Sequence, residues 1–187
     1  MTDADAPVEA EPTPVIDPAL PLKADLVIRN HMLAACAASI VPVPVVDMAA
    51  ITVVQINMIR KLAAMHGKTF SESSVRNTIA ALVGGVGSQS VGIVAGVSIA
   101  KAIPVVGWAV GIVALPTIVG ASTYAIGRVF LRHFEEGGAI HDISADKMKA
   151  YYAEQRDSGK KVVASLRDKI HQKTAPKQDD VAEAATA

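Results

Sequence analysis

The sequence contains little sulfur, few aromatic side chains and no net charge. Its one cysteine, Cys36, permits neither an internal disulfide nor a thiolate metal cluster. Only 4% of the residues are aromatic, whereas 51% are hydrophobic, mainly Ala, Val and Ile. Small apolar side chains suit close contact between helices in lipid better than the filling of a soluble core. The zero net charge provides no overall field that attracts nucleic acid, so we expect no nucleic-acid partner.

Charge is almost absent from the middle of the chain. From Thr78 to Gly127 the only formally charged residue is Lys101. A membrane-spanning helix needs roughly 20 consecutive, mostly apolar residues, because each residue advances the helix by only about 1.5 Å. Residues 78–100 and 105–127 each reach that length, with Lys101 between them. The sequence therefore predicts a two-helix membrane hairpin over 78–127.

Small residues recur every four positions in the first of these apolar segments. Such spacing lets two helix backbones approach closely, which is a main source of helix association in lipid. We favour a helix-packing seam over the alternative that these residues only reflect an alanine-rich chain. The predicted seam comprises Gly84, Ser88, Gly92 and Gly96 in the first segment, and Gly107 and Gly111 in the second.

Two amphipathic helices are predicted before the hairpin. The first covers 23–40, and Pro42 and Pro44 end it because residues preceding proline are pushed out of the α-helical region. The second begins just after Pro44 and ends at Gly67, a natural C-terminal stop. Asp47 falls in its first turn, where the helix dipole favours a carboxylate.

The apolar neighbourhood of Asp47 allows two interpretations. In the first, which we favour, the carboxylate is satisfied by backbone amides of the first turn. In the second, it is a buried charge that pairs with a basic group such as Arg128 across the bundle.

The segments that flank this region have distinct compositions. Residues 1–22 are acidic and rich in proline, and 174–187 are similarly polar, so both are predicted to be disordered tails. No basic segment of a signal peptide precedes the domain. Residues 139–173 form a predicted basic amphipathic helix with Ser144 as its cap. That helix suits either a membrane surface or protein partner, or the solvated surface of a compact bundle.

No spacing of reactive side chains indicates catalysis. The five histidines lack the spacing of a metal site such as HExxH. Gly67-Lys68-Thr69 resembles the end of a phosphate-binding loop, but Leu62 occupies the position of the first glycine and no strand precedes it. We therefore expect no enzyme activity, no metal and no cofactor.

Several blocks together resemble bacterial domain-of-unknown-function family 697, over roughly residues 23–138. They are Pro42–Asp47 followed by Gln55–Ile59, the glycine-rich hairpin with Ile103–Gly107, and Thr123–Arg128 leading to His133–Gly138. That family occurs alone or on the C-terminal side of Era-like GTPase domains, so the resemblance implies a membrane-associated partner of a separate GTPase. The candidate structural or partner-binding residues are Pro42, Pro44, Asp47, Gln55, Tyr124 and Arg128.

The sequence thus predicts an all-α protein: an amphipathic helix pair, a two-helix glycine-rich membrane hairpin and a C-terminal amphipathic helix. The favoured function is a non-enzymatic scaffold anchored in the lipid bilayer, with homo-oligomerisation also open. One alternative is an oligomeric pore lined by Ser88, Gln89 and Ser90. Another is a soluble bundle that inserts the hairpin on a trigger.

The distribution of basic residues predicts the orientation of the hairpin. Basic residues flank it on both sides, whereas the turn between its helices has only Lys101. Because short loops rich in Lys and Arg remain in the cytoplasm, both termini are expected there, with the protein in the bacterial inner membrane.

Overall fold

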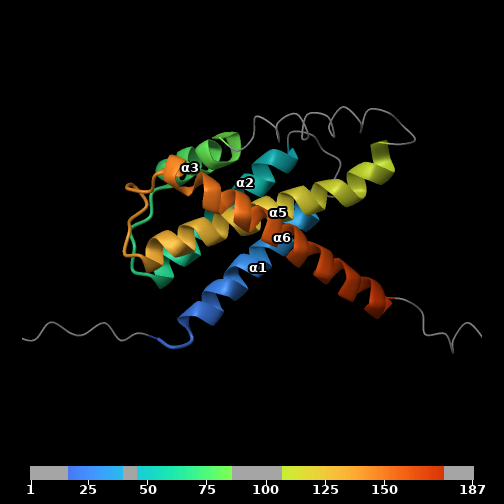
Figure 1. Cartoon of the computed structure of the whole chain (residues 1–187), viewed down its shortest axis with the longest axis horizontal. Helices are drawn as coiled ribbons and strands as arrows, with labels where there is room; N and C mark the ends of the chain where they lie inside the picture. The colour runs from blue at the N-terminus through green and yellow to red at the C-terminus, as the bar shows by residue number, and fades with distance from the viewer. Residues whose placement is uncertain (1–16, 40–45, 86–106, 175–187) are drawn as a thin grey trace, which may run out of the picture.

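The computed structural model describes residues 17–39, 46–85 and 107–174, and within these residues the chain forms five α-helices and no strand (Figure 1). The predicted all-α class is confirmed. The helices are α1 (Leu20–Ala38), α2 (Val46–Met65), α3 (Glu72–Gly85), α5 (Gly107–Glu135) and α6 (Ala145–Thr174).

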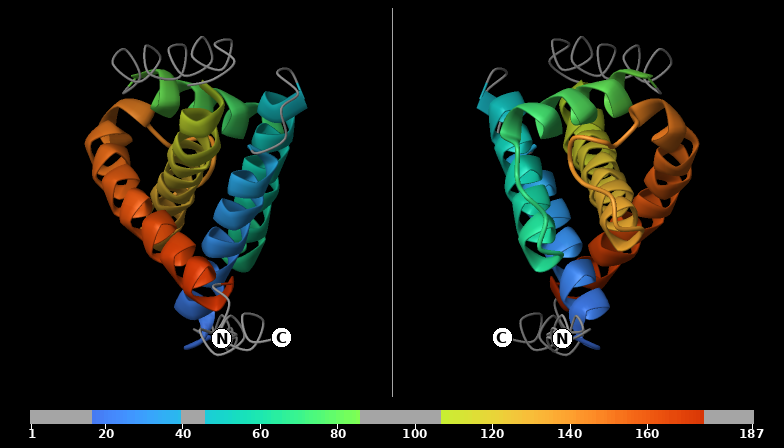
Figure 2. Two further views of the ribbon diagram at one scale, coloured as in Figure 1. Left: turned by 90° about the vertical axis from the view of Figure 1, so that its right-hand side faces the viewer. Right: turned by 90° about the vertical axis from the view of Figure 1, so that its left-hand side faces the viewer.

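Helix α5 is the centre of the bundle. α1 runs antiparallel to it, since Asp25 lies near Arg128 and Cys36 lies near Pro116 at the other end. α2 runs in the same direction as α5, and Gln55 of α2 contacts Thr123. α6 crosses α5, and α3 lies along one edge of the molecule beside the beginning of α6 (Figures 1 and 2).

The hydrophobic core forms where these helices meet. Phe130 of α5, Ile28 of α1 and Met58 of α2 are completely buried, and Tyr152 of α6 and Val75 of α3 join the same cluster. Complete burial of one such apolar side chain stabilises a fold by roughly 1.5–3 kcal/mol. All five helices therefore contribute to a single core.

Two glycines end helices, and the first of them, Gly67, is the predicted stop of α2. Gly67 has φ +63° and Gly137 has φ +88°, a left-handed conformation that glycine adopts without penalty. Beyond Gly67, the Lys68 N–H donates to the Ala63 carbonyl at 2.8 Å. An equivalent hydrogen bond closes the end of α5, where the Gly138 N–H donates to the His133 carbonyl at 2.9 Å. Both ends are Schellman motifs, which satisfy carbonyls that the helix leaves unpaired.

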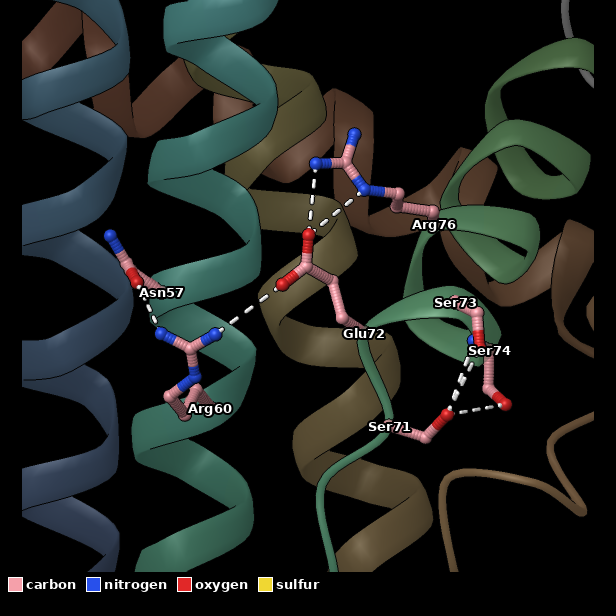
Figure 3. A network of polar contacts seen from close by, with 7 residues as sticks. All are labelled: Asn57, Arg60, Ser71, Glu72, Ser73, Ser74 and Arg76. Atoms are coloured by element: carbon pink, nitrogen blue, oxygen red, sulfur yellow. Dashed lines mark hydrogen bonds and ion pairs between the residues drawn. The ribbon is translucent and has the colours of Figure 1, made fainter.

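The beginning of α3 is fixed against α2 by a polar network (Figure 3). Ser71 precedes the helix, and its hydroxyl lies 3.5 Å from the Ser74 amide, as expected for an N-cap. Glu72 binds Arg76 of its own helix at 2.9 Å and lies 3.6 Å from Arg60 of α2. These side chains are about half exposed, so the network orients α3 more than it stabilises the fold.

The helix boundaries differ from the prediction at two places. α1 begins at Leu20, with Pro21 in its first turn, so the last residues of the predicted acidic tail are helical. Proline is tolerated there because the first turn has no N–H partners to lose. α5 continues past Gly127 to Glu135, so the predicted second hairpin segment and the following basic block form one helix. The expected disorder of 1–16 and 175–187 concerns residues outside the described part.

Only one described stretch has the length and composition of a membrane span. It is Ala114–Glu135 of α5, and 56% of its apolar window is buried inside the bundle. Most of the predicted first segment, residues 86–100, lies outside the described residues. Its beginning, Thr78–Gly85, is the second half of α3, which packs against the core through Thr78, Ile79 and Leu82.

Candidate functional site

Residues 120–128 of α5, here called the α5 junction, are where α1, α2 and α6 converge. Glycine makes this approach possible at two positions. A Cβ atom at Gly120 would collide with the Cys36 sulfur of α1 and lie 2.9 Å from Val163 of α6. A Cβ at Gly127 would lie 2.9 Å from Ile28 of α1 and 3.1 Å from the Met58 sulfur of α2. Real Cβ atoms essentially never come closer than 3.0 Å to a neighbour, and 3.1 Å is tighter than most of their contacts, so the helices approach most closely where glycine provides no side chain.

The closest approach of α6 to the junction occurs at Gly159. A Cβ placed there would lie 2.9 Å from both the Cα and the carbonyl oxygen of Ala121, and 3.2 Å from the Tyr124 Cβ. Backbone atoms cannot move away as a flexible side chain can. Gly159 therefore brings the two helix backbones into direct contact, and Tyr124, a predicted candidate, packs beside it.

A buried hydrogen bond joins α2 to the junction. The Gln55 amide nitrogen donates to the Thr123 hydroxyl oxygen at 3.1 Å. Gln55 is 6% exposed and Thr123 is completely buried. Polar groups at such depth need partners, because an unpaired one costs about 1–3 kcal/mol. The pair therefore sets the register of α2 against α5, which gives the predicted candidate Gln55 a structural role.

A looser ion pair joins α1 to the end of the junction. Arg128 Nη1 lies 3.8 Å from Asp25 Oδ1, and each side chain is about one-third exposed. Asp25 also accepts from the Arg29 Nε of its own helix at 2.6 Å. The side chain of Asp47 lies outside the described residues, so the described acidic partner of Arg128 is Asp25 and the Asp47 interpretations remain predictions.

Hydroxyl and thiol groups make two further links between helices. The Tyr152 hydroxyl of α6 lies 2.8 Å from the Ser122 hydroxyl of α5, and burial raises the pKa of Tyr152. The Cys36 thiol of α1 donates to the Pro116 carbonyl at 3.2 Å, and burial raises the pKa of the thiol. A thiol with a raised pKa is mostly protonated and a poor nucleophile, which agrees with a packing role for Cys36.

The predicted glycine seam is only partly within the described chain. Gly107 and Gly111 begin α5, and a Cβ at Gly84 would meet no described atom within 4 Å. The seam therefore stays a prediction. The candidates outside the described residues are Pro42, Pro44, Ser88, Gly92 and Gly96.

The sequence analysis did not single out three glycines at which helices meet in the α5 junction: Gly120, Gly127 and Gly159. Gly120 and Gly127 lie in the apolar segment that it identified, and their spacing of seven fits one helix face. Gly159 interrupts an otherwise continuous helical pattern, which is a usable signal of close packing. Nothing in the sequence pairs Asp25 with Arg128, or Thr123 with Gln55.

The contacts at the junction hold helices together. In the described ranges, no three His, Cys, Asp or Glu side chains group as metal ligands would. The polar groups that meet there bind one another across helix interfaces. Their arrangement can fix the positions of α1, α2 and α6 around α5.

Comparison with known proteins identifies the family. A family model described as a domain of unknown function, DUF697, matches residues 21–161. The chain belongs to the DUF697 family. The match extends beyond the predicted 23–138 to include most of α6, so the helix that crosses the α5 junction is part of the family domain.

One similar protein matches nearly the whole chain. Magnetosome membrane protein 22 of Magnetospirillum gryphiswaldense (strain DSM 6361 / JCM 21280 / NBRC 15271 / MSR-1) is 49% identical over 180 residues, which are 96% of this DUF697 chain and 90% of that protein. No solved structure matches the chain.

Proposed function

We propose that this DUF697 protein is a non-enzymatic membrane scaffold. Its uncharged stretch over 78–127, the two ends of which also pack into the bundle as parts of α3 and α5, anchors it in the lipid bilayer of a bacterial inner membrane or a compartment continuous with it. The bundle around the α5 junction then presents a rigid surface to a protein partner. The partner class implied by the family resemblance is a separate GTPase.

The observation that carries the proposal is the composition of α5 together with the relative's name. α5 has 29 residues and carries no charged side chain before Arg128. The relative, 49% identical over almost the entire chain, is called a membrane protein. A long uncharged helix preceded by a second uncharged segment is typical of a membrane hairpin.

The positions of the helix ends support the proposal that both ends of the described chain lie on the cytoplasmic side of the membrane. α3 and the start of α5, which precede and follow residues 86–106, lie at one edge of the molecule (Figures 1 and 2). The beginning of α1 and the end of α6 lie at the opposite edge (Figures 1 and 2). A bundle built this way keeps both ends of the described chain away from the bilayer.

Burial of α5 favours a second candidate function. More than half of its membrane-length window is covered by the other helices, with exposed Lys160, Lys161 and Arg167 on α6. A helix buried in the core of a soluble protein can have the same length and apolar composition as a membrane span. In this alternative the bundle is soluble and inserts its apolar segments only on a trigger.

Fractionation of cells that express the full chain separates these functions. A membrane scaffold stays in the membrane pellet after an alkaline carbonate wash, whereas a soluble bundle remains in the supernatant. Ile112→Arg introduces a charge into the uncharged part of α5, which costs about 2.5–3.5 kcal/mol near the centre of a span. It should reduce the wash-resistant fraction, whereas Ser165→Arg, at an exposed position of α6, should not. Recovery of the unmodified chain in the supernatant would contradict the scaffold proposal.

A further inference from the structure

Helix α1 is apolar on two sides. Its inner face packs into the core through completely buried residues such as Ile28 and Met32. Its outer face also carries large apolar side chains: Leu22 is 72% exposed, Leu26 57% and Leu33 41%. Ala37 is also exposed. Because each residue turns an α-helix by about 100°, these four residues lie within about 60° of one another around the helix axis. We call Leu22, Leu26, Leu33 and Ala37 the α1 stripe.

The spacing of the α1 stripe reads the same in both directions. The intervals between its members are four, seven and four residues, so the stripe is symmetric about the peptide bond between Arg29 and Asn30. Two such helices that run in opposite directions place Leu26 of one opposite Leu33 of the other, and Leu22 opposite Ala37. A surface that matches itself in this manner is what a two-fold symmetric interface requires.

The polar residues near the centre are compatible with that pairing. Asn30 and Arg29 are exposed on opposite flanks of the stripe and lie closest to the symmetry point. An amide at the axis can donate to and accept from the same amide of the second copy. Each Arg29 is already bound to Asp25 of its own helix at 2.6 Å, which reduces repulsion between the two guanidinium groups.

The charges around the stripe argue against lipid as its occupant. Helices that lie on membranes are rich in Lys and Arg on their polar face. Here Lys23 pairs with Asp17 at 2.7 Å, and Arg29 pairs with Asp25, so acids balance bases. A neutral apolar stripe with an amide near its middle fits a protein surface of the same composition.

From this geometry we infer that the α1 stripe binds the α1 stripe of a second copy of this chain, as an antiparallel two-fold pair centred between Arg29 and Asn30. The inference goes beyond the proposed membrane function and does not depend on it. Because α1 runs antiparallel to α5, an antiparallel α1 pair directs the uncharged segments of the two copies in opposite directions, so this dimer forms between chains that are not inserted side by side in one flat bilayer.

Cross-linking with a short thiol reagent tests the pairing in full-length chains in which Cys36→Ala removes the native thiol. Asn30→Cys should cross-link efficiently to its own copy, and Leu22→Cys should cross-link poorly. A mixture of Leu26→Cys and Leu33→Cys chains should give several-fold more cross-linked dimer than either chain alone. Equal self-cross-linking at positions 22, 26, 30 and 33 would indicate a parallel pair and overturn the inference, as would no cross-linking at any position.

Light scattering of the purified full chain, in detergent if it is membrane-bound, provides the second measurement. Leu33→Glu should change the mass from a dimer to a monomer, whereas Val53→Glu on α2, at a position that is 51% exposed, should leave the dimer intact. A monomeric unmodified chain would overturn the inference. So would a Leu33→Glu chain that stays dimeric or leaves the membrane pellet, since the latter would mean that lipid covers the stripe. The membrane proposal is tested independently, because a chain that is not anchored would be recovered in the supernatant when the unmodified protein is fractionated.

Discussion

Gly159 of α6 and Ala121 of α5 bring two helix backbones into contact. The position that a Cβ would take at residue 159 lies 2.9 Å from the Ala121 carbonyl oxygen, a distance that real Cβ atoms do not adopt. This contact fixes where α6 crosses α5. It also makes the position sensitive to the smallest substitution.

Gly159→Ala should therefore destabilise the fold, although alanine is the better helix former. Without the contact, the substitution would stabilise a helix interior by about 0.5–1 kcal/mol. Overpacking against backbone should reverse the sign and cost about 1–3 kcal/mol. Chemical unfolding monitored by circular dichroism measures the change. Gly84→Ala, where no described atom lies within 4 Å, is the matched control and should be neutral or slightly stabilising. A Gly159→Ala chain as stable as the Gly84→Ala chain would contradict the contact.

Thr123→Val should strand the buried Gln55 amide. The loss is expected to be about 1–3 kcal/mol of unfolding free energy, because the amide keeps its desolvation cost without its acceptor. Gln55→Met in the same chain should recover part of that loss. A double-mutant cycle then gives a coupling energy of about 0.5–3 kcal/mol. Thr69→Val, at an exposed position, serves as the control. Strictly additive effects of the two substitutions would show that the pair does not hold α2 in register.

The ion pair of Arg128 should contribute little. Asp25→Asn is expected to lower the unfolding free energy by about 1 kcal/mol or less, since both side chains are partly exposed and 3.8 Å apart. Asp47→Asn should also cost about 1 kcal/mol or less if its carboxylate only caps the first turn of α2. A collapse of the Asp47→Asn protein that Arg128→Gln rescues would instead reveal a buried pair between these two residues.

The loop between α5 and α6 should respond to acid through Asp142. The Ala139 N–H, 3.0 Å away, and the His133 ring, 2.6 Å away, hold the pKa of the Asp142 carboxyl below its ordinary value of 3.8. A carboxylate with a lowered pKa in the folded state stabilises that state above the ordinary value, and the stabilisation is lost as the pH falls through the lowered pKa. Asp142→Asn should therefore reduce stability at neutral pH and make it less dependent on pH in that acidic range. The difference in unfolding free energy between the unmodified protein and the Asp142→Asn protein, measured by chemical unfolding at each pH, should become smaller as the pH falls. A constant difference from neutral to acidic pH would exclude this role.

Local features of the fold were predictable because their causes are local. Gly67 ends α2, Gly137 lies just beyond α5, and Ser71 precedes α3, each through bonds within a few residues of the chain. The start of α2 after Pro44 follows in the same way from a restriction on backbone conformation. Such positions need no knowledge of which helices later meet.

The packing partners were not predictable from one sequence. The sequence singled out Gln55 as a candidate and Thr123 as part of a family-like block, but nothing in it indicated that both side chains are buried and face each other. The predicted seam did not include Gly120, Gly127 or Gly159, although a Cβ at each of these positions would come very close to a neighbouring helix. The spacing of small residues predicts that helices can approach, and the tertiary arrangement decides where.

The most direct measurement is the accessibility of two engineered cysteines in intact cells, with Cys36→Ala as the background. Ala102 lies between the two uncharged segments, and Ser144 directly precedes α6. If the hairpin crosses the inner membrane with both termini in the cytoplasm, an impermeant thiol reagent should label Ala102→Cys from outside and leave Ser144→Cys unlabelled until the membrane is permeabilised. Labelling of Ser144→Cys but not Ala102→Cys in intact cells would reverse the orientation. Protection of both until permeabilisation, with the protein in the soluble fraction, would contradict membrane anchoring itself.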